Sequence, residues 1–191
     1  MQKFGISDEE FIRGKVPMTK AEIRAMVMVK AGIEKNGRVA DIGAGTGSIS
    51  IEAALAASEG EVYSIERNPE GIHLIEENAK KFGCHNIHAI RGTAPEAMDQ
   101  LPEKLDVIII GGSSGNMHEI LNRSEELLTD KGRIVLTAVT AETTAEIVKE
   151  FADRTFKLDG FQMQINRLRK LGRYHLYNPI SPVFIFTAER I

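Results

Sequence analysis

The sequence predicts a doubly wound α/β fold with a mostly parallel sheet and an antiparallel pair of C-terminal strands at one edge. From residue 37 onward, short β-branched runs alternate with helix-length segments, which is typical of a parallel sheet covered by helices. The first run leads directly into a glycine-rich loop that opens a helix. After residue 153 the alternation stops and two longer β-rich segments follow, which indicates the antiparallel pair.

The N-terminal part predicts an arm followed by a helix. The first 17 residues are polar and interrupted by glycine and proline, so we expect an arm over residues 1–17 that lies on the body. Thr19 stands three residues before Glu22, which is the spacing of a helix-capping box, and Gly32 would end the helix that follows.

The later elements carry their own start and stop signals. Asn68 before Pro69 predicts a helix start, and Gly83 predicts its end. Asn116, three residues before a glutamate, and Thr140 are candidate N-caps of two further helices. The predicted strands are 38–42, 61–66, 87–91, 105–110 and 133–139, the helices lie around 48–57, 69–82, 116–128 and 141–152, and the antiparallel pair is Phe156–Arg167 and Pro182–Ala188, joined by a basic segment.

Length, composition and charge restrict the class of protein. The 191 residues have the size of one domain, so we expect a single domain over 1–191. With 24 Lys and Arg against 27 Asp and Glu, the net charge of −3 disfavours a dedicated nucleic-acid binder. No apolar run is long enough for a membrane span, and the first residues do not read as a signal peptide. The single cysteine, Cys84, cannot form an internal disulfide, and no Cys/His cluster has zinc-ligand spacing, so we expect neither a disulfide nor a metal site. The same cysteine usage predicts a cytoplasmic location.

The most informative stretch is the glycine loop at residues 43–47. Gly43, Gly45 and Gly47 follow an apolar strand at alternate positions, and a helix opens at Ser48. Glycine permits a tight turn and lets backbone N–H groups approach a ligand at the helix N-terminus, which favours a nucleotide-like ligand. The fit to NAD is imperfect, because Ser48 occupies the position where the dinucleotide fingerprint needs Gly or Ala. A turn that binds no ligand is the alternative.

Two carboxylates accompany this loop. Glu66 ends the second predicted strand, 25 positions after Asp41, where a carboxylate can accept both hydroxyls of a ribose. The alternative for Glu66 is a solvent-exposed carboxylate at the start of the next helix. Asp41 lies inside a strand end and needs donors if buried, which the backbone amides of the glycine loop or a ligand ammonium could supply.

These residues, together with a glycine-containing turn at 92–94, resemble the class I S-adenosylmethionine-dependent methyltransferases, whose sheet is Rossmann-like. A narrower resemblance, to the CbiT-type cobalt-precorrin methyltransferases, covers nearly the whole chain. The stretches that carry it are 8–12, 17–19, 41–47, 66–70, 94–97, 111–115 and 182–184.

The resemblance implies C-methylation of a precorrin-6B-type cobalt-precorrin at meso carbon 15, with S-adenosylmethionine as methyl donor. It also implies decarboxylation of a ring acetate, a place in cobalamin (vitamin B12) biosynthesis, and a homotetramer. A class I methyltransferase that acts on RNA or protein is the alternative. The expected cofactor-binding residues are Thr19, Asp41, Gly43, Ala44, Gly45, Thr46, Gly47, Glu66, Thr93 and Ala94, and Thr19 could instead, or in addition, serve as a helix cap.

Substrate binding is expected at two places. The loop after the fourth strand contains Gly111, Gly112 and Ser113, which leaves room for a bulky substrate, and it lacks the Asn/Asp-Pro-Pro-aromatic motif of many amino-nitrogen methyltransferases. A simple flexible connection is the alternative for this loop. No catalytic acid or base is predicted, the remaining histidines receive no role, and Cys84 is interpreted as a packing residue.

The segment 154–175 is the second candidate for substrate binding, because it holds six basic residues against one acidic residue. We expect Arg167, Arg169 and Arg173 to pair with carboxylates of a tetrapyrrole. A solvated strand pair, a subunit interface and an RNA-contacting surface are the alternatives.

Overall fold

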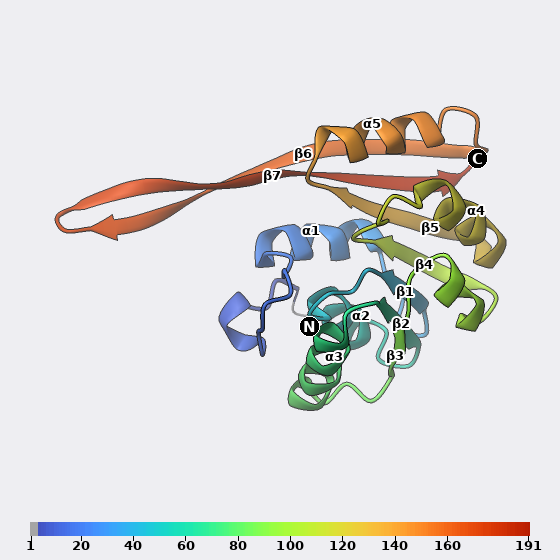
Figure 1. Ribbon diagram of the computed structural model, residues 1–191, viewed down its shortest axis with the longest axis horizontal. Helices are drawn as coiled ribbons and strands as arrows, with labels where there is room; N and C mark the ends of the chain where they lie inside the picture. Colours follow the sequence, from blue (N-terminus) through green and yellow to red (C-terminus); the bar gives the residue numbers. More distant parts are fainter. Residues whose placement is uncertain (1–3) are drawn as a thin grey trace.

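A single seven-stranded sheet organises the molecule (Figure 1). The computed structural model describes residues 4–191, so the first three residues of the predicted arm lie outside the described part. The strand order is β3-β2-β1-β4-β5-β7-β6; β1 to β5 pair in parallel, and β7 pairs antiparallel with both β5 and β6. The predicted fold class is therefore confirmed. The strands are β1 Arg38–Ile42, β2 Glu61–Glu66, β3 Ile87–Arg91, β4 Leu105–Ile110, β5 Leu128–Ala138, β6 Phe156–Leu171 and β7 Tyr174–Arg190.

Most helix boundaries follow the predicted signals. Asn68 accepts a hydrogen bond from a backbone N–H of the helix it opens, as Thr140 does, and Gly83 ends its helix in the left-handed region. Thr19 is not the helix cap, because the helix begins at Ala21 and Lys20 occupies the N-cap position. Asn116 is at an N-cap position without a side-chain cap bond. The helices are η1 Asp8–Glu10, α1 Ala21–Ala31, α2 Ser48–Ala56, α3 Pro69–Phe82, η2 Glu96–Gln100, α4 Met117–Leu127 and α5 Ala141–Glu150.

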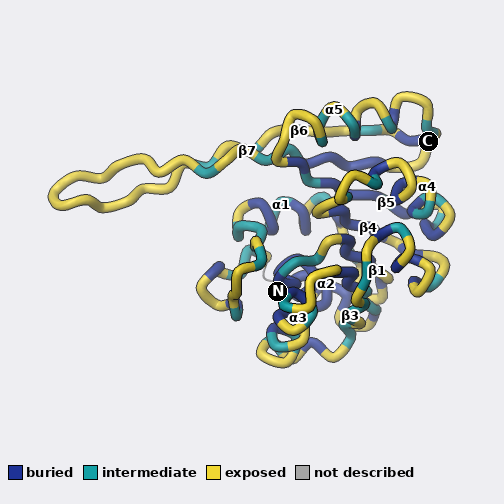
Figure 2. The backbone as a smooth tube through the Cα atoms, viewed as in Figure 1, coloured by how far each residue is buried: buried dark blue, intermediate teal, exposed yellow. Residues whose placement is uncertain are grey.

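Two apolar layers cover the sheet, because successive strand residues point to opposite faces. Val39 of β1 packs with α1 and α2 in one buried cluster, whereas its neighbours Ala40 and Ile42 pack with η2, α4 and α5 in the other. The buried parts of the strands form the centre of the body (Figure 2). Within residues 4–191, no helix is long and apolar enough to cross a membrane.

The last two strands form a hairpin much longer than predicted. The predicted strands ended at Arg167 and began again at Pro182, but β6 and β7 continue to a two-residue turn at Gly172 and Arg173. The segment between Arg167 and Pro182, expected to be a basic connection, therefore consists of two paired strands and their turn. Because β7 pairs with β5 only from Phe184 to Glu189, the rest of the hairpin extends past the carboxyl edge of the parallel sheet. Its outer end, residues 166–179, projects from the body and is exposed (Figures 1 and 2).

Candidate functional site

A cavity of about 590 Å³ lies at the carboxyl ends of the parallel strands, the edge where open α/β sheets bind ligands. Its volume falls within the range of roughly 300–1,000 Å³ that is usual for small-molecule and cofactor sites. The walls come from the N-terminal segment before α1, the loops after β1 to β4, the end of β5 and the base of the hairpin.

The loop after β1 forms the floor of this cavity. Gly43, Gly45 and Gly47 all have positive φ values, of 75°, 59° and 75°, a conformation that disfavours other residues. A Cβ atom on Gly43 would lie 3.1 Å from the carbonyl oxygen of Gly112, so the β1 and β4 loops approach closely only because this position is glycine. The alternating glycines are therefore required by the local backbone and by packing.

The Glu66 carboxylate is fixed at the end of β2. One oxygen accepts a hydrogen bond from the backbone N–H of Gly45 at 2.8 Å, and the other accepts from that of Asn68 at 2.7 Å. The side chain lines the cavity, yet the residue is only 8% exposed. The interpretation of Glu66 as a freely solvated carboxylate is thus wrong. Each oxygen keeps a further acceptor site, so the group can still bind hydroxyls of a ligand.

Asp41 lies behind the cavity wall and is fully buried. Its Oδ2 accepts a hydrogen bond of 2.6 Å from the Ser50 hydroxyl, which itself accepts one from the Ser64 hydroxyl. Its Oδ1 has no hydrogen-bond partner among residues 4–191. The pKa of Asp41 is raised to about 6, mainly by burial; the charge of Glu66 also raises this pKa, and the hydrogen bonds of Ser50 lower it.

The remaining walls are made by the loops after β3 and β4 and by the base of the hairpin. The Asn116 side chain donates a hydrogen bond of 3.2 Å to the carbonyl of Ala94, which connects the β3 loop to the segment that follows β4. Gly111 donates its N–H to the carbonyl of Ile42 at 2.9 Å, which holds the β4 loop against β1. These contacts bring the predicted segments 92–94 and 111–114 to one cavity.

The structure brings together most of the predicted site residues. Among the predicted cofactor residues, Asp41, Thr46 and Gly47 lie behind the wall, whereas the lining includes Thr19, Gly43, Ala44, Gly45, Glu66, Thr93 and Ala94. The predicted substrate residues Gly111, Gly112 and Ser113 also line it. Within residues 4–191, no group of three or more His, Cys, Asp or Glu side chains is arranged to hold a metal ion.

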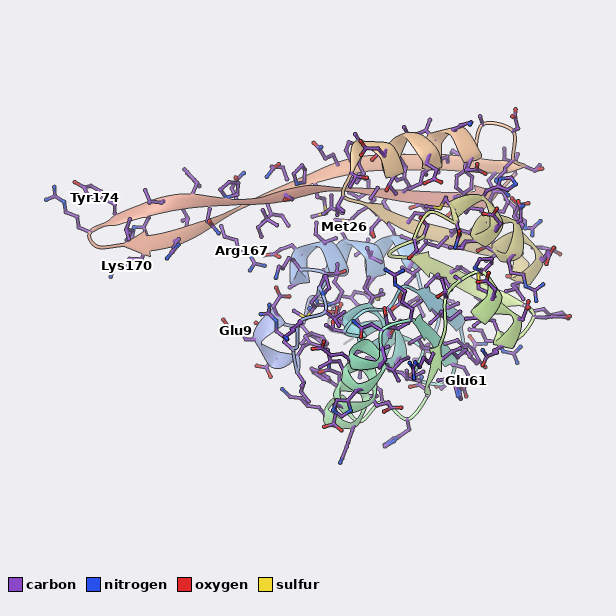
Figure 3. The ribbon with its side chains drawn as sticks, viewed as in Figure 1. Glu9, Met26, Glu61, Arg167, Lys170 and Tyr174 are labelled. Atoms are coloured by element: carbon purple, nitrogen blue, oxygen red, sulfur yellow. The ribbon has the colours of Figure 1, made fainter. Side chains whose placement is uncertain are left out.

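The predicted basic residues of the tail are not brought to the cavity. Arg167 lies where the hairpin passes α1, and its guanidinium pairs with Glu22 at 2.6 Å, which lowers the pKa of Glu22 (Figure 3). Arg169 is two residues further along the same strand, and Arg173 is in the turn. Figure 3 shows the neighbouring Lys170 and Tyr174 at the free end of the hairpin. Substrate binding by these arginines stays a prediction.

Sequence reasoning missed several lining residues that lie next to predicted ones. Lys20 follows Thr19 and Arg67 follows Glu66, and these are the basic side chains among the lining residues of the described chain. Ile180 and Ser181 come from β7, directly before the stretch 182–184 that carries the resemblance. The cavity positions of Lys20 and Arg67 follow from their predicted neighbours, but nothing local indicates Ile180.

The chain matches the family model described as the precorrin methyltransferase domain over residues 10–190, which is nearly its whole length. The chain belongs to the precorrin methyltransferase family. The resemblance seen in the sequence is therefore confirmed.

Relatives in this family are similar over their full lengths. One from Sulfurisphaera tokodaii, named probable cobalt-precorrin-6B C(15)-methyltransferase (decarboxylating), is 37% identical over 97% of both chains. Another from Salmonella typhimurium, named cobalt-precorrin-6B C(15)-methyltransferase (decarboxylating), is 35% identical over 97% of this chain and 96% of its own. The crystal structure of precorrin-6y C5,15-methyltransferase from Geobacter metallireducens has a TM-score of 0.92 and 35% identity, covering 98% of both chains.

Proposed function

We propose that this precorrin methyltransferase family member methylates meso carbon 15 of a precorrin-6B-type cobalt-precorrin and removes a ring acetate as carbon dioxide, with S-adenosylmethionine as methyl donor. The observation that carries the proposal is the cavity at the carboxyl edge of the sheet. It is lined by the fixed carboxylate of Glu66, by the glycine loop and by apolar side chains. The names of the full-length relatives supply the substrate class.

The residues present fit S-adenosylmethionine. Glu66 presents fixed carboxylate oxygens for the ribose hydroxyls, and the loop residues Gly43–Gly45 present backbone groups to the amino-acid portion. Thr93 and Ala94 lie on the wall that we assign to the adenine, and Thr19 closes the site from the N-terminal side. Asp41, Thr46 and Gly47 support the loop from behind. When bound, the sulfonium group supplies an electrophilic methyl carbon.

The chain's own contribution to catalysis is positioning. Holding an electron-rich meso carbon in line with the methyl group can supply much of the rate without a covalent nucleophile. Val139, Ile180 and Val183 give the cavity an apolar side that suits a macrocycle. Gly112 and Ser113 line the cavity and can offer backbone N–H groups to its carboxylates, whereas the N–H of Gly111 is held by the carbonyl of Ile42. We assign no side chain as acid or base, because the electron-poor macrocycle can accept the electron pair released when the acetate loses carbon dioxide.

The exposed apolar side chains of the hairpin favour a homo-oligomer, and the family resemblance implies a tetramer. The outer part of the hairpin exposes Leu168, Leu171, Tyr174, Leu176 and Tyr177, an apolar set that contact with further copies of the chain would cover. We assign Arg167, Arg169 and Arg173 to this interface and substrate carboxylates to the cavity loops. A cytoplasmic location fits the free, buried Cys84.

The deciding experiment incubates the purified protein with cobalt-precorrin-6B and S-adenosylmethionine carrying a labelled methyl group. We expect the macrocycle to gain one methyl group and to lose one carbon dioxide, both seen by mass spectrometry. Transfer of the label to tRNA or to a protein substrate, with no change in the precorrin, would support the alternative class. Sedimentation of the same sample measures the oligomeric state.

A further inference from the structure

The segment 4–20, which we call the N-terminal arm, is held on the body by side chains of three helices. It runs beside α1 and α3 (blue in Figure 1). Its last residues, 16–20, line the cavity, so the position of the arm determines how the cavity is closed on that side. A Cβ atom on Gly45 would lie 3.1 Å from the Pro17 carbonyl oxygen, which places the arm directly over the glycine loop.

The two ends of the arm are tied together by a buried ion pair. Arg24 of α1 and Glu52 of α2 pair at 2.6 Å and are 0% and 1% exposed. Glu52 accepts hydrogen bonds from the backbone N–H groups of Gly5 and Ile6, at 3.0 and 2.9 Å. Arg24 donates to the carbonyl of Thr19 at 2.6 Å and also to that of Ile6. This pair fixes the arm on α1 and α2, but it does not touch the glycine loop.

The middle of the arm is connected to the glycine loop by one side chain, Asn78 of α3. Its Oδ1 accepts the backbone N–H of Ile12 at 2.8 Å, and its Nδ2 donates to the carbonyl of Ile12 at 3.1 Å. The same Nδ2 donates to the carbonyl of Thr46 at 3.1 Å. Asn78 is fully buried, and its helix also contacts the loop at Gly47, where a Cβ atom would lie 2.8 Å from Ile75.

We propose that Asn78 is a positioning residue that couples closure of the N-terminal arm to the geometry of the glycine loop. The proposal rests on the proposed function in one respect, namely that the glycine loop binds the cofactor. An amide is suited to this role, because it supplies one acceptor and two donors from a single rigid group. Any movement of the Thr46 carbonyl that accompanies ligand binding is thereby transmitted to Ile12, and a displaced arm disturbs the loop in the same way.

A matched control exists in Asn86. Its Nδ2 donates to the carbonyls of Ala54, Ala57 and Gly60, at 3.3, 2.8 and 3.1 Å, so it also binds backbone through its amide group. These carbonyls belong to α2 and the turn after it and do not line the cavity. Asn78→Asp and Asn86→Asp therefore make the same change in two backbone-binding sites, one at the cofactor loop and one away from it.

The experiment measures binding of S-adenosylhomocysteine by calorimetry and trypsin cleavage at the exposed Arg13 and Lys15 of the arm. In the wild type and in Asn86→Asp we expect equal affinity and slower cleavage when the ligand is present. In Asn78→Asp we expect affinity about tenfold weaker or more, and ligand that no longer slows cleavage. Equal effects in both variants, or full ligand protection in Asn78→Asp, would overturn the proposal.

Two further measurements test the proposal if the first variant does not fold or if the ligand does not bind. If Asn78→Asp does not fold, Asn78→Ser replaces it, because its short hydroxyl cannot bridge the arm and the loop. If the wild type does not bind S-adenosylhomocysteine, the cofactor assignment fails, and hydrogen exchange of the free protein then tests the coupling alone. Coupling predicts faster exchange in the Asn78 variant at both Ile12 and the loop amides, whereas acceleration in the arm only would refute it.

Discussion

Exchanging Glu66 for alanine is the sharpest test of the cofactor site. The change removes the carboxylate that we assign to the ribose hydroxyls, and it also removes the acceptor of the N–H groups of Gly45 and Asn68. A hydrogen bond to a charged group contributes about 1.5–3 kcal/mol. Loss of the ribose contact alone therefore weakens S-adenosylhomocysteine roughly ten- to hundredfold. The freed loop adds to this loss, so the lower figure is the minimum that we expect.

Glu61→Ala is the matched control, because it makes the same substitution at the other end of the same strand. The side chain of Glu61 is half-exposed and pairs with His88, and Glu61 begins β2 whereas Glu66 ends it. Surface pairs of this kind contribute only about 0–1 kcal/mol, and we expect unchanged ligand affinity. Calorimetry on both folded variants decides the question: a Glu66→Ala protein that binds as tightly as Glu61→Ala would refute the ribose assignment.

The remaining predictions concern pH, specificity and the hairpin. The pKa of Asp41, raised from 3.8 to about 6, means that the folded state binds more protons than the unfolded state between these values, so this carboxyl lowers stability as pH rises through that window. Asp41→Asn should therefore gain about 2 kcal/mol of unfolding free energy relative to wild type between pH 4 and pH 7, measured by urea titration; a constant difference would contradict the assignment. NAD should leave the melting temperature unchanged while S-adenosylhomocysteine raises it, because Ser48 replaces the last small residue of the dinucleotide fingerprint; a micromolar NAD complex in calorimetry would reverse this ranking. Arg167→Gln should change stability by no more than about 1 kcal/mol, because its pair with Glu22 is exposed, and should leave KM for the precorrin unchanged; a large rise in KM would restore the substrate role of the hairpin.

The sheet was predictable because its signals are local. Each parallel strand is a short apolar run bounded by turn residues, and the boundaries of β1 to β4 agree with those expected from the sequence. The antiparallel edge was also predictable, since the alternation stops where β6 begins. The length of the hairpin could not be predicted, because the outer parts of its strands bury little apolar surface and carry basic residues. Neither their hydrophobic periodicity nor their composition therefore indicates a strand.

The cofactor side of the cavity was predictable for a related reason. It is built from strand ends and glycine turns, whose residue types are dictated by backbone conformation, as at Gly43 and Gly45. The residues that support the glycine loop from behind depend on contacts between distant segments, so no local pattern in the sequence indicates them. Asn78 lies 66 residues from Ile12 and 32 from Thr46, and an asparagine inside a helix carries no sequence pattern that indicates such contacts.

Charge counting along the chain selected residues that do not line the cavity, and the reason is geometric. Six basic residues within the segment 154–175 indicate an anion site only if they converge, but five of them are spread along the hairpin. The sixth, Arg154, precedes the hairpin and is paired with Glu125 and Glu150. Arg167 is moreover already paired with Glu22. The basic side chains that line the cavity within the described chain, Lys20 and Arg67, are separate in the sequence, and Lys20 reaches the cavity from the end of the N-terminal arm. If the proposed anionic substrate binds at this wall, we expect its affinity to depend on how the arm is held, which would link it to the contacts of Asn78 with the glycine loop.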